Sequence, residues 1–283
     1  MDFRELFNKI TLMSIDLHTH STASDGSLSP SELVLEAKRS GVTVLGLTDH
    51  DTLSGIKEAQ EKARELGIEF VPGIEFSTEV GESEIHILGY HLNPSFSLSL
   101  LLSRLEKSRM DRIRLMLKKL QALKIEINLE DVISEIKEGV YGRPQVAMAL
   151  VRKGYVSSVE EAFQKYLGMG KPAYVPHFKI SPWEAIKLIR EAGGIPVYAH
   201  PGVTARDDLI PSFIKSGLLG LEVFYPEHDQ QTTAKYLNIC RSFSLLVTGG
   251  SDFHGEVRPW VQLGYPGLPE EYYSEFKAYL SSK

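Results

Sequence analysis

The chain has 283 residues, of which 42% are hydrophobic and 24% charged, with a formal net charge of −6. No run approaches the twenty or so apolar residues of a membrane span, and the charged start is unlike a secretory signal, so we expect a cytoplasmic protein without a membrane partner. The negative charge argues against binding of long duplex nucleic acid through a broad basic face.

Seven apolar runs rich in β-branched residues predict strands, near residues 12–17, 42–48, 68–76, 84–90, 195–199, 219–224 and 245–251. A capping box with proline at the first helical position, residues 29–32, predicts a helix that stops at Gly41. The same signature at residues 181–184 opens another helix, and Gly67 ends a third. This alternation predicts an α/β fold with a parallel sheet, and we favour a barrel over an open sheet.

Residues 94–171 break the alternation, because they contain helical patterns and no convincing strand. An apolar stripe runs from Leu101 to Leu120, and shorter helices are predicted around residues 130–137, 144–153 and 159–166. We therefore expect two parts: residues 1–93 with 172–283 as the barrel, and residues 94–171 as an all-helical insertion over its mouth.

The first two strands end in candidate metal ligands. His18 and His20 lie two residues apart, so on a strand they share a face and can bind one ion. Asp25 lies in a Ser-Asp-Gly turn, where an isolated aspartate is more often a turn-former than a ligand. His50 follows the second strand, and we expect Asp49 or Asp51 to orient imidazoles there.

A hairpin brings Glu75 and His86 within reach of one metal ion. A symmetric turn centred between Val80 and Gly81 places Glu75 directly opposite His86, with both side chains on one face. A register slip of one residue would send His86 to the other face.

The later strands end in the same way. His200 precedes Pro201, which favours an extended backbone at the strand end, and Asp252 and His254 repeat the two-residue spacing. These donors are too many for one ion and predict a cluster of two or three divalent metals. A single cysteine leaves imidazole and carboxylate as ligands, which favours Mn, Fe or Zn. The nine candidates are His18, His20, Asp25, His50, Glu75, His86, His200, Asp252 and His254.

Several motifs resemble those of one family over nearly the whole chain. They are DLHTHSTASDG, GLTDHDT, PGIEFST, HILGY, AHP and GSDFHG. Together they are similar to the PHP superfamily, named for polymerase and histidinol phosphatase domains. In the insertion, YGRPQVAMALV and YLGMGKPAYVPH are similar to a branch that removes a phosphate from nucleoside 3′,5′-bisphosphates, and some relatives trim short RNA from the 5′ end.

The resemblance implies a distorted (β/α)7 barrel with three divalent ions. By analogy, His18, His20, Glu75 and Asp252 hold one ion; Glu75, His86 and His200 a second; and Asp25, His50 and His254 the third. The branch often has Gly-Arg-Pro-His where this chain has Gln145, which leaves the substrate role of that position in doubt.

We expect metal-assisted hydrolysis of a phosphate ester on a small nucleotide or short oligonucleotide, with Glu75 and Asp252 as catalytic metal ligands. Arg143 and Lys171 are candidates for a second phosphate, although surface positions would explain them as well. His177 and His228 are expected to face the site. His228 is the candidate general acid, and a metal-bound water is the alternative.

Three other interpretations remain open at this stage. The first is a histidinol-phosphate or other small-molecule phosphatase. The second is a metal-binding module without turnover. The third is an accessory domain of a polymerase. Metal identity, base preference and oligomeric state do not follow from the sequence.

Overall fold

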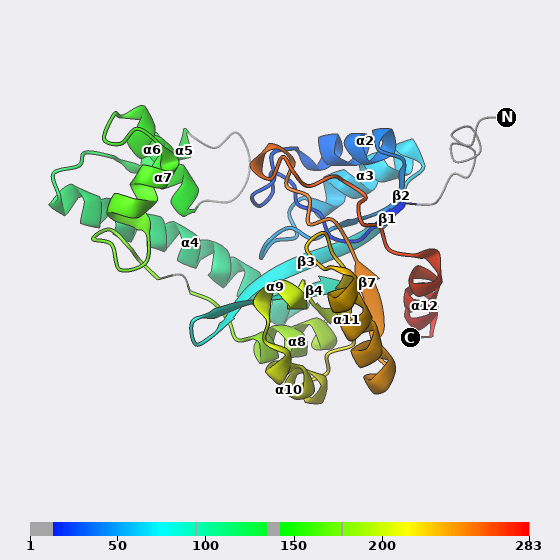
Figure 1. Ribbon diagram of the computed structural model, residues 1–283. Helices are drawn as coiled ribbons and strands as arrows, with labels where there is room; N and C mark the ends of the chain where they lie inside the picture. The colour runs from blue at the N-terminus through cyan, green and yellow to red at the C-terminus, as the bar shows by residue number, and fades with distance from the viewer. Residues whose placement is uncertain (1–13, 94, 135–141, 177, 283) are drawn as a thin grey trace. The chain divides into compact units, whose positions relative to one another are not determined.

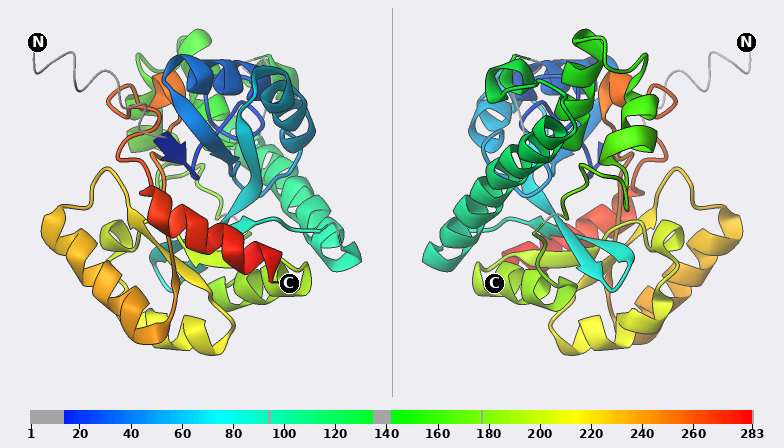
Figure 2. Two further views of the ribbon diagram at one scale, coloured as in Figure 1. Left: turned by 90° about the vertical axis from the view of Figure 1, so that its right-hand side faces the viewer. Right: turned by 90° about the vertical axis from the view of Figure 1, so that its left-hand side faces the viewer.

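In the computed structural model, which describes residues 14–93, 95–134, 142–176 and 178–282, seven strands form one sheet in chain order (Figure 1). The seven predicted strands are confirmed, but the sheet is mixed and not parallel throughout. The fourth strand is antiparallel to both neighbours, because a tight hairpin joins it to the third (cyan in Figure 2). The strands are β1 (Ser14–Asp16), β2 (Val42–Leu47), β3 (Glu69–Val80), β4 (Ser83–Tyr90), β5 (Ile195–Tyr198), β6 (Gly220–Phe224) and β7 (Leu246–Gly249).

Helices that follow one another in the chain pack against neighbouring strands of this sheet (Figure 1). Both predicted capping boxes are present, with Ser29 and Ser181 as N-caps, and Gly67 ends its helix with a left-handed φ of 67°. The helices are α2 (Pro30–Arg39), α3 (Ile56–Leu66), α8 (Pro182–Glu191), α9 (Pro201–Thr204), α10 (Ile210–Lys215), α11 (Gln230–Phe243) and α12 (Glu270–Ser281), with 3₁₀ turns η2 (Asp207–Leu209) and η3 (Gly255–Val257).

Backbone hydrogen bonds join the segments that follow the first and last strands. The Leu17 N–H donates to the Gly249 carbonyl at 3.1 Å, and the Asp252 N–H donates to the His18 carbonyl at 2.8 Å. Gly250 is needed at this crossing, because a Cβ there would overlap the backbone nitrogen of His18. The carboxyl ends of β1 and β7 therefore lie side by side.

A second compact unit, Pro94–Ile180, is helical and has its own apolar core. The predicted stripe forms one long helix whose buried side chains include Leu105, Ile113, Leu117 and Leu120. The end of the helix predicted at 130–137 lies outside the described residues. The elements are α4 (Phe96–Ala122), α5 (Leu129–Ile133), α6 (Arg143–Arg152), α7 (Val159–Ala162) and the π-helix η1 (Phe163–Leu167). Among the described helices, none is long and apolar enough to span a membrane.

Candidate metal centre

The nine donors expected from the sequence gather at the carboxyl ends of the parallel strands. Seven lie on the segments after β1, β2, β5 and β7, and two lie on β3 and β4. The antiparallel β4 belongs to the same sheet, so its side chains can reach the same end. The nine are His18, His20, Asp25, His50, Glu75, His86, His200, Asp252 and His254.

Three overlapping groups of these side chains have ligand atoms within 4.8 Å of one another. Each pair of groups shares one residue: His20, His50 or Glu75. The family resemblance implied three similar groups. It agrees with the second group below, omits His20 from the first, and has His200 where the third has His50. The groups are His20, Asp25, His50 and His254; His18, His20, Glu75 and Asp252; and His50, Glu75 and His86.

Hydrogen bonds outside the groups point ring lone pairs into them. The Nδ1 of His18 lies 2.9 Å from a Glu222 carboxylate oxygen, and the Nδ1 of His254 lies 2.8 Å from the Asp252 carbonyl. Because both partners are acceptors, neutral rings carry the proton on Nδ1 and a lone pair on Nε2. The Nε2 of His18 then lies 3.1 Å from the Nε2 of His20.

Buried atoms at this centre also lack hydrogen-bond partners among the described residues. They are Nδ1 of His20, Oε2 of Glu75 and Nδ1 of His200. Buried polar atoms without hydrogen-bond partners are unfavourable, and a bound cation would satisfy such atoms. The donor set, which is nitrogen and carboxylate oxygen without sulfur, therefore fits divalent metal ions.

Glu75 lies at the centre of the cluster and is fully buried. Burial alone would raise the pKa of its carboxyl group, but the surrounding imidazoles, His18 foremost, hold that pKa well below its usual value. Glu75 is therefore ionised and can accept two ions, one on each oxygen. Its Oε2 lies 3.1–3.2 Å from ring nitrogens of His18, His20 and His50, and its Oε1 lies 2.9 Å from His86 and 3.2 Å from His200.

The predicted turn of the hairpin is wrong by one residue. Val80 pairs with Ser83, so Glu75 lies opposite Leu88 and not His86. The pairing shifts by two residues, which keeps His86 on the same face of the hairpin. The two side chains still meet, diagonally, with 2.9 Å between His86 Nδ1 and Glu75 Oε1.

The imidazoles differ in their affinity for protons. Burial would lower the pKa of His20, but Asp252 and Glu75 outweigh it and raise that pKa to about 9. Burial is likewise outweighed at His86, mainly by Glu75, and its pKa rises to about 10. Burial lowers the pKa of His50 to about 3. Without metal, His20 and His86 are therefore protonated, and a bound cation must displace those protons.

Glu222 supports two of the ligand candidates and was missed by the sequence analysis. It is fully buried, contacts His18 Nδ1, and accepts the backbone N–H of His200 at 2.8 Å. That bond holds His200 in a left-handed conformation with φ 30°, so the extended backbone predicted from Pro201 is wrong. The only local signal for Glu222 in the sequence is that an acidic residue interrupts an apolar strand.

Three further buried aspartates fix the loops that carry the ligands. Asp16 accepts from the Ser251 N–H at 2.9 Å and from its hydroxyl at 2.6 Å, which ties the end of β7 to β1. Asp49 accepts from the Ser21 N–H at 2.8 Å. The Asp51 carboxylate accepts from a backbone N–H on β3. In these contacts, Asp49 and Asp51 hold backbone and hydroxyl groups, whereas the sequence analysis expected them to orient imidazoles.

A cavity of about 400 Å³ opens beside the cluster, and Glu75, His86, His200 and Asp252 line it. Tyr225 and Arg258 lie in its wall, and both donate to Oδ2 of Asp252, the tyrosine at 3.0 Å. These donors leave Oδ1 of Asp252 directed at the ring nitrogens of the neighbouring histidines. The cavity therefore joins a cluster of metal donors to a cationic side chain.

The contacts of His228 do not favour the general-acid role. Its Nδ1 donates to the Val223 carbonyl at 2.9 Å, and its Nε2 accepts the Gly202 N–H at 3.1 Å. Burial lowers its pKa, so the ring is neutral and both nitrogens are occupied by backbone. His228 therefore supports the loop after β5, and this proton assignment follows from the contacts.

The expected substrate-binding residues belong to the helical unit or lie outside the described residues. The Arg143 guanidinium packs over the rings of Phe163 and Tyr174, 5.5 and 5.8 Å from their centres. Lys171 is exposed, and His177 lies outside the described residues. Gln145 accepts the Gly142 N–H at 2.9 Å, so its side chain caps α6.

Comparisons with known proteins agree with this geometry. The family model described as PHP domain matches residues 16–175. The chain is similar to a 5′-3′ exoribonuclease of Haemophilus influenzae, with 38% identity over 88% of this chain and 92% of the relative. It is also similar to a 3′,5′-nucleoside bisphosphate phosphatase of Chromobacterium violaceum, with 34% identity over 86% and 88%. A solved metal-dependent phosphoesterase of Bifidobacterium adolescentis superimposes with a TM-score of 0.81 at 31% identity, over 93% and 95%.

Proposed function

The chain belongs to the PHP domain family of metal-dependent phosphoesterases, and from that premise we propose that it hydrolyses the 3′-phosphate of nucleoside 3′,5′-bisphosphates. The observation that carries this proposal is the convergence of three donor groups around Glu75 beside a cavity of about 400 Å³. The relative named as a bisphosphate phosphatase supports the substrate class. The relative named as an exoribonuclease supports a second activity, the trimming of short RNA from its 5′ end.

We propose that two or three ions of Mn, Fe or Zn occupy the three donor groups. Bound divalent ions supply Lewis-acid stabilisation of the phosphoryl oxygens and activate the attacking water. Glu75 would hold two ions, one on each oxygen, because its two oxygens face different sets of imidazoles. The Nε2 of His200 lies 3.2 Å from Glu75 Oε1, so His200 would join His86 and Glu75 in holding an ion.

The residues around the ions orient the substrate. Arg258 lies in the cavity wall next to Asp252, where its guanidinium can bind a phosphoryl oxygen. We retain Arg143, Lys171 and His177 of the helical unit as candidates for the second phosphate. Because both ring nitrogens of His228 are occupied, we assign the proton for the leaving oxygen to water in the cavity.

The finer fold assignment is also a proposal. The hydrogen bonds between the segments after β1 and β7 support a sheet that closes into a distorted (β/α)7 barrel. The division into two compact units supports an interpretation of the helical unit as an insertion in that barrel.

The test is phosphate release after reconstitution with Mn²⁺ from adenosine 3′,5′-bisphosphate, 5′-AMP, histidinol phosphate and a short 5′-phosphorylated RNA. We expect preference for the bisphosphate, with release of 5′-mononucleotides from the RNA. Preference for histidinol phosphate would overturn the substrate assignment and keep the enzyme class. Bound metal without release from any of these substrates would favour a binding module.

A further inference from the structure

Charge is divided unevenly between the two units. Residues 94–180 carry 15 lysines and arginines against 9 aspartates and glutamates, a formal net charge of +6. The other residues carry 16 against 28, which gives −12 and accounts for the total of −6. A basic unit within an acidic chain is typical of a protein that binds a polyanion.

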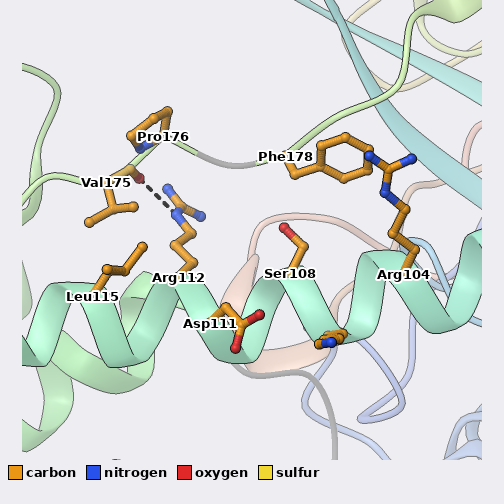
Figure 3. A pocket seen from close by; sticks show the side chains of 9 residues that line it. Arg104, Ser108, Asp111, Arg112, Leu115, Val175, Pro176 and Phe178 are labelled. Carbon is orange, nitrogen blue, oxygen red and sulfur yellow. Dashed lines mark hydrogen bonds between the residues drawn. The ribbon is translucent and has the colours of Figure 1, made fainter.

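The positive charge is concentrated on α4, which holds seven lysines and arginines and two acidic residues. Arg104, Lys107 and Arg112 line a cavity of about 420 Å³ together with Ser108 and Phe178, here called the α4 groove (Figure 3). Arg104, Ser108 and Arg112 follow one another at spacings of four residues, and Lys107 lies three residues after Arg104, so these side chains share one side of about 12 Å of helix. The groove is therefore a row of cations and not a single charge.

The wall of the α4 groove is fixed to the helix. The Arg112 Nε donates to the Val175 carbonyl at 2.8 Å, and the Lys119 Nζ donates to the Tyr174 carbonyl at 2.6 Å. Farther along the same wall, the Arg104 guanidinium lies against the Phe178 ring (Figure 3). Its central carbon is 4.4 Å from the centre of that ring. The groove thus combines a cationic floor with a stacked guanidinium and aromatic ring.

Two of the cations are available to a ligand. Arg104 and Lys107 are exposed, and within the described part of the chain neither pairs with a carboxylate. Asp111 also lines the groove, but its charge is compensated by Arg114 at 3.1 Å. Arg104 and Lys107 therefore give the groove a positive charge that no carboxylate among the described residues neutralises.

We propose that the α4 groove binds the phosphate backbone of single-stranded RNA, with the plane of the Arg104 guanidinium as a stacking surface for one base. A positive groove that follows a backbone and offers a flat stacking group is the usual design for single strands. A row of cations over about 12 Å suits several successive phosphates, whereas a mononucleotide would occupy only part of it. This inference rests on the proposed function and names an oligonucleotide as the larger substrate.

The test is fluorescence anisotropy of a short 3′-labelled single-stranded RNA with the full chain in EDTA, so that binding is measured without hydrolysis. The double variant Arg104→Ala/Lys107→Ala should bind about tenfold more weakly. The slope of log K against log salt should fall by about 1.4, which is about 0.7 for each lost phosphate contact on a single strand. Arg104→Lys should keep the salt slope and still weaken binding, because it removes the planar stacking group.

Lys118→Ala is the matched control, because Lys118 is an exposed lysine of the same helix outside the groove lining. The inference is overturned if this control loses as much affinity as Lys107→Ala, or if duplex RNA or polyglutamate binds as tightly as the single strand. Phosphate release from adenosine 3′,5′-bisphosphate by the Mn²⁺-loaded wild type tests the proposed function separately. Turnover without groove-dependent binding rejects this inference alone, and groove-dependent binding without turnover rejects the proposed function alone.

Discussion

Nδ1 of His18 lies 2.9 Å from Oε1 of Glu222, and both side chains are completely buried. The contact places the imidazole proton on the side away from the metal donors and leaves the Nε2 lone pair directed at Glu75 and Asp252. Glu222 is not itself a member of the three donor groups. It nevertheless decides which nitrogen of His18 a metal ion meets.

Glu222→Gln should lower metal affinity about 10- to 100-fold, because the amide lacks the charge that holds the His18 proton on Nδ1. The measurement is competition for Mn²⁺ or Zn²⁺ with a chelating dye. Glu79→Gln, the same substitution at an exposed position of β3, should leave affinity unchanged. Equal affinities in the two variants would show that Glu222 does not orient the ligand.

Glu75→Gln should abolish turnover and lower, but not eliminate, bound metal. Two donor groups contain Glu75, whereas the group of His20, Asp25, His50 and His254 does not. We therefore expect elemental analysis to find about one remaining ion for each chain. A metal count equal to that of the wild type would remove Glu75 from the bridging position.

The metal-free chain should lose stability as the pH rises from about 6.5 to about 10. The folded-state pKa values of His20 and His86, about 9 and about 10, lie above the unfolded value of 6.5. Their protonated forms therefore stabilise the fold fully below about pH 6.5, and this contribution disappears as the pH rises through the folded values. Urea unfolding in EDTA across this window measures the effect.

With Mn²⁺ the dependence of stability on pH should weaken, since bound imidazoles carry no exchangeable proton on the ligating atom. A metal-free stability that does not change with pH would contradict the protonation states.

Arg143→Ala should weaken binding of adenosine 3′,5′-bisphosphate more than binding of 5′-AMP. Its guanidinium is held over Phe163 and Tyr174, which fixes a bidentate cation suited to a second phosphate. The measurement is KM for the bisphosphate and the inhibition constant of 5′-AMP. Arg152→Ala, at the other end of α6, is the control and should change both equally or not at all. Equal losses with Arg143→Ala would show that Arg143 does not read the second phosphate.

Gly250→Ala should destabilise the chain by about 2–4 kcal/mol, because the new methyl group would overlap the His18 backbone where the β1 and β7 ends cross. Gly81→Ala is a useful comparison. Its φ of 61° imposes conformational strain, but no atom lies within 4 Å of the new methyl group, so we expect a loss of about 1 kcal/mol. Chemical unfolding in EDTA measures both. Similar losses would mean that the two strand ends separate at little cost.

The sequence predicted the strands and the gathering of the candidate metal donors, because every candidate except Asp25 ends an apolar run or lies in one. The orientation of β4 was harder, because a short turn at one end and a helical unit at the other reverse it relative to the parallel strands. The predicted turn of the hairpin was also displaced by one residue, which shifts the pairing by two. Turn geometry, and not hydrophobic pattern, decides which residue begins the return strand.

The supporting carboxylates could not be predicted in the same way. Glu222, Asp16 and Asp49 act on residues far away in the chain, and local pattern says only that an acid interrupts an apolar run. The contacts of His228, which do not favour the predicted general-acid role, could not be foreseen for a related reason. Whether a histidine can deliver a proton depends on what its two nitrogens touch, and here both touch backbone.

His20 and His50 each serve two donor groups, yet a neutral imidazole has a single lone pair to give. Glu75 can offer one oxygen to each of two donor groups, whereas each of these imidazoles can ligate in only one group at a time. In the proposed centre, ions in neighbouring groups would therefore compete for shared ligands and load with unequal affinity, and the last to bind would complete its coordination with solvent. That last ion would exchange fastest, so its identity would follow the metals that the surroundings supply, while the earlier ions would remain in place.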